Sequence, residues 1–457
     1  DQARRPALRA FLIKMNTYKI ESVNMRGIGV IRSGKQRIRV PGAIAGERVK
    51  LDIVYDKYGN CFGKIQNLLE TSNQRVAPNC NNFPSCPGCG LRHLSGNSQS
   101  QRIIDFVKSV TAKELQASEI PEPVFHGLRI NEKYRTRCVL SLHCLGERSV
   151  LGMKSHFPDE PPISLSSCPN HHPDLNHLIQ ITEKFLNEGN PAKKILQNIR
   201  EVHFNLSADG LHRILFVILD HEKVKNSFKQ ILSEYFKSMD ISILCLTVKS
   251  YKSGITYKEP EVLSGNRWIS IETQFAEFRA LPGVWTPVVP ESVNQVVETL
   301  QDDPSFEGCG NLLELGCGAG LITVPLAGKT TFAIGIDRNR HAIESAIINA
   351  ERLNISNIAF RTGKAQHTLR KFAAQGKKAN FVIIHGMRKP FGSEVMDLIQ
   401  ALKNRSVILM SPSINAWFQD LRPILKRKWR LTRINIFDQL PHTAGYLLYG
   451  NLLKDND

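Results

Sequence analysis

The stretch Asn311-Leu312-Leu313-Glu314-Leu315-Gly316-Cys317-Gly318-Ala319-Gly320 decides the fold of the C-terminal part of the chain. Its apolar start is typical of a buried strand, its glycines form an E-x-G-x-G-x-G turn, and a helix is predicted from Leu321. Glycines in such a turn let the backbone approach a nucleotide closely at the carboxyl end of the strand. The stretch therefore predicts a cofactor site, and a tight turn without a ligand is the alternative. The candidate cofactor-binding residues are Glu314, Gly316, Gly318 and Gly320.

A second strand is predicted for Thr331–Ile336, and it ends at Asp337. A carboxylate at this place is suited to accept hydrogen bonds from ribose hydroxyls, so Asp337 joins the candidate cofactor site. With this carboxylate in phase, the turn fits S-adenosylmethionine better than a dinucleotide. The strand–helix alternation predicts a doubly wound parallel sheet from about residue 283. Its further elements are a helix at 341–353, strands at 380–384 and 406–411, and a closing antiparallel pair at 431–437 and 445–453.

The charge of the chain is the outlier in its composition. The 457 residues carry a net charge of +18 with a pI near 9.5, and residues 1–50 hold 12 Lys or Arg against 3 Asp or Glu. A positive excess of this size favours a polyanionic partner, here a nucleic acid, over a merely solvated basic surface. No apolar run reaches the roughly 18 residues that a membrane helix needs, so no membrane partner is predicted.

The N-terminal third of the chain shows two segments of different character. Residues 1–15 form a basic extension, which is a remnant of a targeting segment, an artefact of the start site or an ordinary basic arm. The predicted compartment is accordingly the cytoplasm, with an organellar matrix as the alternative. Residues 16–70 alternate with turn signals and predict a small OB-like barrel, a common RNA-binding module. The length of the chain predicts two to four domains.

Four of the ten cysteines form a pattern, and their spacing begins C-x5-C-x2-C on a loop rich in Pro and Gly. Four thiolates suit zinc or an iron–sulfur cluster, whereas a disulfide framework is less suited to a large chain without a secretory signal. His171 and His172 are interpreted as solvated loop residues, not ligands. Five other cysteines are interpreted as small buried hydrophobes, namely Cys61, Cys138, Cys144, Cys245 and Cys309. The four candidate metal ligands are Cys80, Cys86, Cys89 and Cys168.

With these motifs in place, nearly the whole chain resembles the bacterial and organellar RNA (uracil-C5)-methyltransferase family, which acts on tRNA or ribosomal RNA. Residues 16–67 resemble its TRAM domain, and the four candidate ligands match its [4Fe–4S] cysteines. Leu313 to Ala327 resembles its cofactor motif, and Asn349 matches an Asn of the family. Segments 134–137 and 151–154 resemble its central RNA-binding region, and 438–443 resembles its closing segment.

The resemblance implies a fold class and a set of partners. The expected α/β fold is a class I S-adenosylmethionine methyltransferase domain, Rossmann-like, at 283–457. An N-terminal OB-like TRAM barrel at 16–70 and a mixed α/β central domain with the cysteine loop at 71–282 precede it. The implied cofactors are a [4Fe–4S] cluster and S-adenosylmethionine. The implied partner is RNA, either rRNA or tRNA, including ribosomal assembly particles.

The chain departs from the family where the family's chemistry takes place. In the family a thiolate adds to uracil C6, and a base later removes the C5 proton. Aligned by their neighbours, the nucleophile position is Pro412 and the base position is Leu447. The family's Asp-Pro-Pro-Arg reads His385-Gly386-Met387-Arg388, its Phe-Gln-x-Asn reads Pro287-Val288-Val289-Pro290, and an acidic position near adenine is Lys364.

These losses favour an RNA-binding protein that keeps the scaffold and its cofactor site, without uracil-C5 chemistry. The alternative is an active RNA methyltransferase with another target atom, for which no covalent thiolate is needed. Cys317 lies in the cofactor turn and is discounted as a substitute nucleophile. His385 is a weak candidate base, and a polar residue in a decayed pocket is the competing interpretation. No other catalytic residue is predicted.

Overall fold

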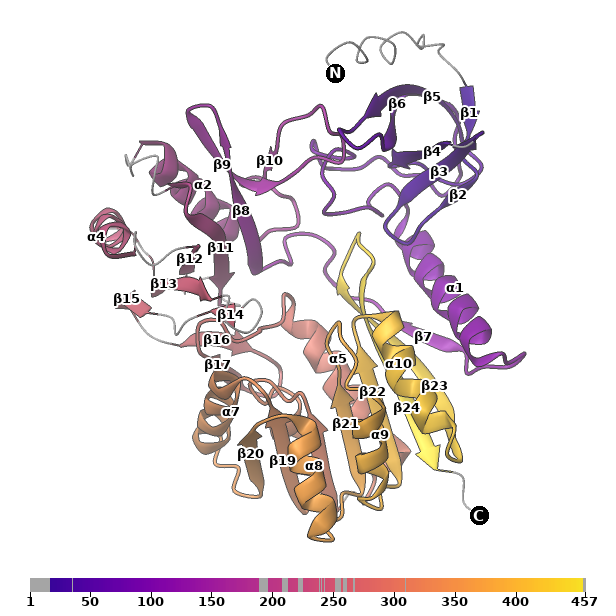
Figure 1. Ribbon diagram of the computed structural model, residues 1–457, viewed down its shortest axis with the longest axis vertical. Helices are drawn as coiled ribbons and strands as arrows, with labels where there is room; N and C mark the ends of the chain where they lie inside the picture. The colour runs from indigo at the N-terminus through magenta and orange to yellow at the C-terminus, as the bar shows by residue number, and fades with distance from the viewer. Residues whose placement is uncertain are drawn as a thin grey trace, which may run out of the picture. The chain divides into compact units, whose positions relative to one another are not determined.

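The computed structural model (Figure 1) describes residues 17–454 except 35, 189–195, 208–212, 221–224, 238, 240, 242, 251–255, 258–260, 266, 267 and 309. The basic extension predicted for residues 1–15 lies outside the described residues. The chain divides into two compact units. The first holds the described residues up to Ile103, with Met153–Ser164 and His442–Ala444, and the second holds the remainder. No helix of the described part is long and apolar enough to cross a membrane.

The first unit begins with a sheet in the order β1-β5-β6-β4-β3-β2. Its ends β1 and β2 are consecutive in the sequence and are joined by Ile20 and Glu21, whose amides donate to the carbonyls of Glu47 and Val30. One bent segment therefore forms both ends of the sheet, pairing with β5 through β1 and with β3 through β2, and so closes it. The predicted barrel-like domain is confirmed. The strands are β1 (Thr17–Lys19), β2 (Ser22–Val23), β3 (Ile28–Ser33), β4 (Gln36–Pro41), β5 (Arg48–Tyr55) and β6 (Cys61–Glu70).

The barrel sorts apolar side chains inward and cations outward. On β4, Ile38 and Val40 are buried whereas Arg37 and Arg39 are exposed, as expected for a strand with one face on a core. One charge lies inside: Glu47 accepts hydrogen bonds from the amide of Ile44 at 2.8 Å and from Nε of Arg75 at 2.6 Å. This pair ties the turn before β5 to the chain that leaves β6.

The second unit contains a mixed sheet in which β9, β8, β11, β12, β13 and β14 are neighbours in that order and β15 pairs with β13. Strands β12 and β13 are parallel, whereas β8 with β11, β11 with β12 and β13 with β15 are antiparallel. Helix α2 contacts β11 and α4 contacts β13. The elements of this region are β8 (Arg137–Leu145), β9 (Arg148–Met153), α2 (Pro173–Glu188), β11 (Ile199–Leu206), β12 (Arg213–Leu219), α4 (Lys225–Phe236), β13 (Ile243–Ser250), β14 (Thr256–Tyr257) and β15 (Glu261–Gly265). Strand β10 (Ile163–Ser164) belongs to the first unit.

The last sheet has the order β20-β19-β18-β21-β22-β24-β23-β7. Its first five strands are parallel, and β24 runs antiparallel to both of its neighbours. The parallel strands consist of nearly continuous apolar runs, because helices cover both faces of this part of the sheet. The strands are β18 (Asn311–Leu315), β19 (Phe332–Asp337), β20 (Ile358–Thr362), β21 (Phe381–His385), β22 (Ser406–Ser411), β23 (Trp429–Leu440) and β24 (Gly445–Lys454).

The doubly wound sheet was predicted, and β18 and β22 have the predicted bounds. The closing pair β23 and β24 is antiparallel as predicted, but it does not form the edge of the sheet. Strand β7 (Pro123–His126) pairs in parallel with β23, outside the hairpin. A four-residue strand far upstream carries no local signal of its partner, so the sequence did not reveal it.

Two layers of helices cover this sheet. Helices α5, α6 and α7 contact one another in turn, and so do α8, α9 and α10, which Figure 1 shows side by side in front of the strands. The remaining elements are α1 (Gly96–Leu115), β16 (Ile269–Glu272), β17 (Glu277–Ala280), α5 (Pro290–Gln301), the 3₁₀ turn η2 (Pro304–Phe306), α6 (Thr323–Ala327), α7 (Arg340–Arg352), α8 (Ala365–Ala374), α9 (Ser393–Gln400) and α10 (Ile414–Leu425).

The buried carboxylate of the barrel gives a stability prediction. Replacing Glu47 with Ala leaves the Arg75 guanidinium, which is 15% exposed, without its partner, and should destabilise the barrel by about 3 kcal/mol. Hydrogen exchange of residues 17–70 in the full chain, followed by mass spectrometry, measures this loss. Glu70→Ala, which removes the solvent-exposed ion pair with Arg48, is the matched control and should change exchange little.

The same carboxylate should make the barrel sensitive to acid. Burial alone would raise the pKa of Glu47, but hydrogen bonds from Arg75, Ile44 and Ser72 outweigh it and the pKa lies below its ordinary value of 4.5. Its contribution is therefore complete above pH 4.5 and is lost as the pH falls through the lowered pKa. Equal acid sensitivity of the wild type and Glu47→Ala would contradict this assignment.

Candidate functional site

The turn after β18 is held between two neighbouring strands. Gly316, Gly318 and Gly320 have φ values of +82°, +55° and +82°, a region that favours glycine. A Cβ at Gly316 would lie 2.4 Å from the carbonyl oxygen of His385 on β21. On the other side, the amide of Gly316 donates to the carbonyl of Ile336 at 2.7 Å. Gly316 is therefore required by close packing, whether or not a ligand binds.

Glu314, the first residue of the motif, is fully buried. The hydroxyl of Thr323 on α6 donates to its Oε2, which fixes the carboxylate. Its Oε1 has no hydrogen-bond partner among the described residues, and Nδ1 of His385 is 3.9 Å away. A buried acceptor without a donor is costly, so Oε1 is suited to a cationic donor of a bound ligand. Thr323 was missed in the sequence, because a threonine in an apolar helix carries no signal of this contact.

Asp337 closes the second side of the turn. Its Oδ2 accepts from the amide of Gly318 at 3.0 Å and its Oδ1 from the amide of Asn339 at 2.8 Å. A carboxylate has about four acceptor positions, so both oxygens can accept further bonds from a ligand. The structure thus brings Glu314, the three glycines and Asp337 together at the carboxyl ends of β18 and β19.

Two buried polar residues support the turn from below. Asn349 on α7 donates to the carbonyl of Ala319 at 3.0 Å, and its Oδ1 accepts from the amide of Arg279 on β17 at 2.7 Å. Cys317 packs beneath the turn, and a Cβ at Gly335 would lie 2.8 Å from its Sγ. Burial, with the nearby Glu314 and Asp337 carboxylates, raises the pKa of the Cys317 thiol well above its ordinary value. Cys317 is therefore a packing residue and not a thiolate.

The residues at the predicted nucleophile and base positions, Pro412 and Leu447, lie near the carboxyl end of β22. Strand β22 ends with Ser411 opposite Leu448 of β24, so the next residues in this register are Pro412 and Leu447. The alignment of Pro412 and Leu447 with the family's nucleophile and base stays a prediction. Pro412 is exposed, and the following Ser413 caps α10 by accepting from the amide of Ala416. Leu447 is 3% exposed and belongs to the main apolar core.

Two other groups at this end of the sheet can accept a proton. His385, the predicted weak candidate, ends β21 with its side chain 20% exposed. Asp438 near the end of β23 was not singled out, because one carboxyl after an apolar strand is a common pattern. Burial raises the pKa of Asp438 to about 7, although the amide of Leu440 donates to it. A group with such a pKa exchanges protons readily near neutral pH.

The predicted metal ligands are distributed over both units. Cys80, Cys86 and Cys89 are partly exposed residues of the first unit, and Cys168 is a partly exposed residue of the second. Within the described ranges, no three His, Cys, Asp or Glu side chains lie close enough together to hold a metal ion. Four thiols are the appropriate donors for an iron–sulfur cluster, but the structure does not show the cluster, which stays a prediction.

Two interpretations of side chains near this loop were wrong. His171 is buried, with 1% exposure, and its Nδ1 lies 3.1 Å from Oδ1 of Asn176, whereas a solvated residue was expected. Burial lowers its pKa to about 4, so His171 is neutral at neutral pH. Cys144 is exposed, because it lies at the uncovered end of β8. Cys61 and Cys138 are buried as predicted, and nothing is described of the side chains of Cys245 and Cys309.

Comparison with known proteins agrees with this geometry. Residues 308–440 match the family model of a methyltransferase domain. The chain is 24% identical over 436 residues to an uncharacterized RNA methyltransferase of Caldanaerobacter subterraneus, covering 93% of this chain and 94% of that protein. It is 22% identical over 451 residues to an uncharacterized RNA methyltransferase of Listeria innocua, covering 96% and 98%.

A solved structure covers the full architecture. The Pyrococcus abyssi tRNA (uracil-54, C5)-methyltransferase in complex with S-adenosyl-L-homocysteine matches with a TM-score of 0.70 and 17% identity, over 96% of this chain and all of that chain. The predicted class I S-adenosylmethionine methyltransferase fold, with mixed α/β sheets and a barrel-like N-terminal region, is thereby confirmed. The relatives of this chain are RNA methyltransferases.

The geometry of Asp337 gives a binding prediction. Asp337→Asn removes a charged acceptor at the expected ribose position and should weaken S-adenosylmethionine binding by about 10- to 100-fold, the value of a hydrogen bond to a charged group. Isothermal titration calorimetry measures this change. Glu344→Gln on the exposed side of α7 is the control and should bind as the wild type does. Equal affinity of Asp337→Asn and the control would contradict the assignment.

Proposed function

We propose that this chain is an RNA-binding protein on an RNA methyltransferase scaffold, which retains an S-adenosylmethionine site and has lost uracil-C5 chemistry. The observation that carries the proposal is the identity of two residues, Pro412 directly after β22 and Leu447 on β24, next to the last pair of these strands in register, Ser411 and Leu448. Proline has no nucleophile and a core leucine has no basic group, so neither can activate a uracil ring. The remaining fold is intact around them.

A substitute thiol at this end of the sheet is not supplied by Cys317. Its raised pKa keeps the sulfur protonated at neutral pH, and the thiolate is the reactive form of cysteine. Its side chain is also buried beneath the turn. The covalent route to a C5-methylated uracil therefore lacks both its thiolate nucleophile and its base.

The cofactor site is supported by its own residues. The free oxygen of Glu314 suits the ammonium of an amino-acid ligand, and the Asp337 carboxylate suits ribose hydroxyls. The open backbone at Gly318, where an added Cβ would meet no atom within 4 Å, leaves room for a ligand. Bound S-adenosylmethionine would supply an electrophilic methyl group there. The residues of this chain bind and orient it.

RNA is the proposed partner, and the barrel supports it. Tyr58 is 78% exposed with Nζ of Lys57 5.0 Å from its ring, and Arg39 lies over Phe62 at 5.6 Å. Exposed aromatic rings beside cations stack bases and neutralise phosphates, the combination that single-stranded RNA requires. We therefore assign the barrel a TRAM-like role toward rRNA or tRNA, including ribosomal assembly particles. The cytoplasm or an organellar matrix is the proposed compartment.

A second candidate function is methyl transfer to an atom other than uracil C5. The observation that favours it is Asp438, a carboxyl with a pKa of about 7 at the same end of the sheet as the cofactor turn. Transfer to a ring nitrogen or a hydroxyl needs an aligned acceptor and a base, but no covalent thiolate. In this candidate Asp438 or His385 holds the proton that the acceptor atom loses.

The lost nucleophile predicts that no covalent RNA adduct forms. RNA carrying 5-fluorouridine traps enzymes that add a thiolate to C6, because the fluorine cannot be removed as a proton. The wild-type protein should give no band of increased mass on denaturing gels. A stable adduct with the wild type would contradict the main proposal.

Mass mapping of RNA from cells with and without the gene separates the two candidate functions. Loss of a methyl mark other than 5-methyluridine supports the second candidate, and unchanged marks support the first. Loss of 5-methyluridine itself overturns both. Leu447 has no acidic group that a substitution could neutralise, so the variant to test is Asp438→Asn. It should remove the methyl mark if Asp438 is the base of the second candidate function, and it should change no mark under the first.

The four-cysteine cluster is proposed on its donor set alone. Anaerobically purified protein should be brown, absorb near 400 nm and contain about four iron atoms per chain. Cys86→Ser and Cys168→Ser should each lose the iron, whereas Cys144→Ser, an exposed cysteine outside the set, should retain it. A colourless protein with one zinc per chain would contradict the iron–sulfur assignment.

A further inference from the structure

A row of cations lies at the edge of the last sheet that is opposite the cofactor turn. Strands β21, β22 and β23 run in the same direction, so the segments that precede them all reach this amino-terminal edge. Each of these segments ends in exposed cations. We call this set the basic edge, and it consists of Lys377, Lys378, Lys403, Arg405, Lys426 and Lys428.

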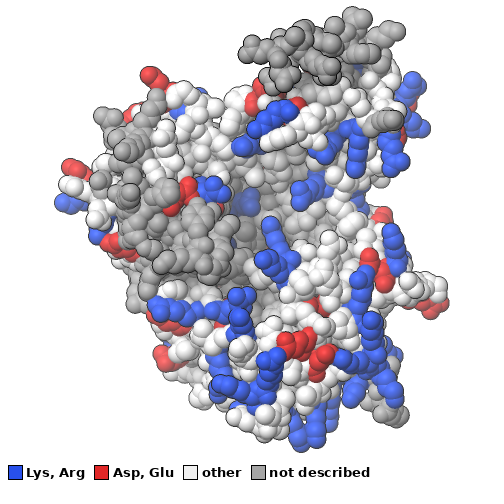
Figure 2. Space-filling view, in the orientation of Figure 1, with Lys and Arg blue, Asp and Glu red and all other residues white. Residues whose placement is uncertain are grey.

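Cations outnumber carboxylates at the basic edge, where the segment before β18 adds the exposed Asp302 and Glu307. In the part of the chain that the structure describes, no carboxylate lies within ion-pair distance of Lys377, Lys378, Lys403, Arg405 or Lys426. The nearby Arg427 is paired with Asp397, and Asp303 is buried, where it accepts from Asn451 at 2.5 Å. Figure 2 shows Lys and Arg side chains along the lower border of this face, where the strands of Figure 1 begin. The edge therefore attracts polyanions.

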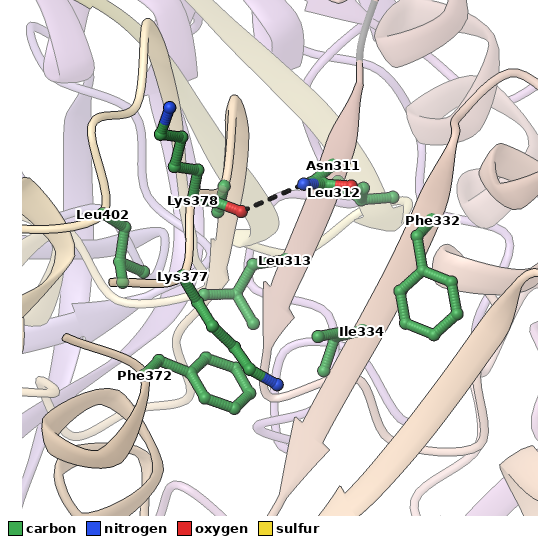
Figure 3. A pocket seen from close by; sticks show the side chains of 10 residues that line it. Asn311, Leu312, Leu313, Phe332, Ile334, Phe372, Lys377, Lys378 and Leu402 are labelled. Carbon is green, nitrogen blue, oxygen red and sulfur yellow. Dashed lines mark hydrogen bonds between the residues drawn. The ribbon is translucent and has the colours of Figure 1, made fainter. Parts of the chain in front are cut away.

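A pocket opens within this edge. Its volume is about 330 Å³, at the small end of the roughly 300–1,000 Å³ of ligand pockets. Leu313 of β18 and Ile334 of β19, which are partners in register, form one wall, and Leu402 closes another side. Figure 3 shows these apolar side chains around the opening, with Lys377 reaching across toward Phe372. The pocket is apolar inside and cationic at its rim.

Two aromatic rings give this pocket a preference for flat ligands. Phe372 of α8 has Nζ of Lys377 at 4.8 Å and Cζ of Arg361 at 5.7 Å from its ring. Phe332 at the start of β19 also lines the pocket and is 38% exposed. Phe372 itself is only 4% exposed, so Phe332 is the ring that is open to a ligand, with the cations around Phe372 beside it. An exposed aromatic ring near cations is a usual stacking surface for nucleobases.

The pocket is separate from the cofactor site. Asn311 begins β18 at the pocket, and the glycine turn follows the other end of the same strand, about 16 Å away for a strand of this length. The basic edge spans the three inter-strand steps from β21 to β23, about 14 Å in total, which exceeds the reach of one phosphate. A single mononucleotide would therefore leave part of the edge uncovered.

We propose that the basic edge and its pocket bind a single-stranded segment of RNA, with one base inserted among the apolar side chains and the flanking phosphates on the cations. The proposal rests on the RNA partner inferred above and is independent of any methyl transfer. It gives the chain a second RNA contact, on the edge of the sheet that faces away from the cofactor. The RNA segment bound at the basic edge is therefore not the segment that lies at the cofactor turn.

The test uses anisotropy of a labelled single-stranded RNA over a range of salt concentrations with the full chain. The quadruple variant Lys377→Gln, Lys378→Gln, Lys403→Gln and Arg405→Gln should lose at least tenfold in affinity. Its slope of log K against log salt should fall in magnitude by about two to three, since each phosphate contact contributes roughly 0.7. The matched control removes four exposed charges elsewhere and should change affinity less than twofold: Lys113→Gln, Arg148→Gln, Lys184→Gln and Lys237→Gln.

A second variant tests the pocket separately from its charges. Phe332→Ala should weaken binding by roughly tenfold while leaving the salt slope unchanged, because stacking releases no counterions. Equal effects of the quadruple variant and its control would overturn the proposal, as would full affinity of Phe332→Ala. If Arg37→Gln with Arg39→Gln in the barrel removes all binding while the basic-edge variant binds normally, the proposed function stands and this inference fails. A wild type that binds no RNA contradicts both.

Discussion

The contact between Gly316 and the carbonyl oxygen of His385 is the constraint on which the methyltransferase sheet depends. Strand β18 lies between β19 and β21, and the turn that follows it must pass through the space between their ends. Any side chain at Gly316 would occupy the position of that carbonyl. In the same closely packed turn, the amide of Gly318 donates to Asp337 and the carbonyl of Ala319 accepts from Asn349. A tight backbone therefore arranges the cofactor turn, the helix α7 and the hairpin strand β17 together.

This constraint separates the residues that the fold itself requires from those that it does not require. Gly316 and Asn349 each satisfy packing or a buried hydrogen bond, so replacing them would damage the fold whether or not a ligand binds. Pro412 is exposed and Leu447 packs in the core, and neither place requires a thiol or a carboxylate for stability. Groups that serve only chemistry can disappear without structural cost. An intact glycine turn is consequently evidence for a methyltransferase fold, and the cofactor itself has to be argued from the free oxygen of Glu314.

The sequence predicted what local patterns encode. Strands β18 and β22 had their observed bounds because a continuous apolar run marks a covered parallel strand, and the alternation in β4 marked the barrel. It did not predict β7, whose partner β23 lies far along the chain, or the exposure of Cys144, which depends on what covers the end of β8. The pocket at the amino edge and the pKa of Asp438 were also out of reach. Both arise from how separate segments meet, and neither leaves a periodic signal.

Strand β7 also sets an order of events during synthesis. Pro123 pairs with Ile434, so the outer strand of the sheet is made long before its partner. A pairing of such long sequence separation is slow to form, because the entropy of closing the loop precedes any gain from contact. On the ribosome, the segment around β7 stays unpaired while the sheet assembles, and it finds its partner only after β23 has been translated. Premature termination near β23 would leave an unpaired strand edge at both ends of the translated chain, a substrate for aggregation and quality control.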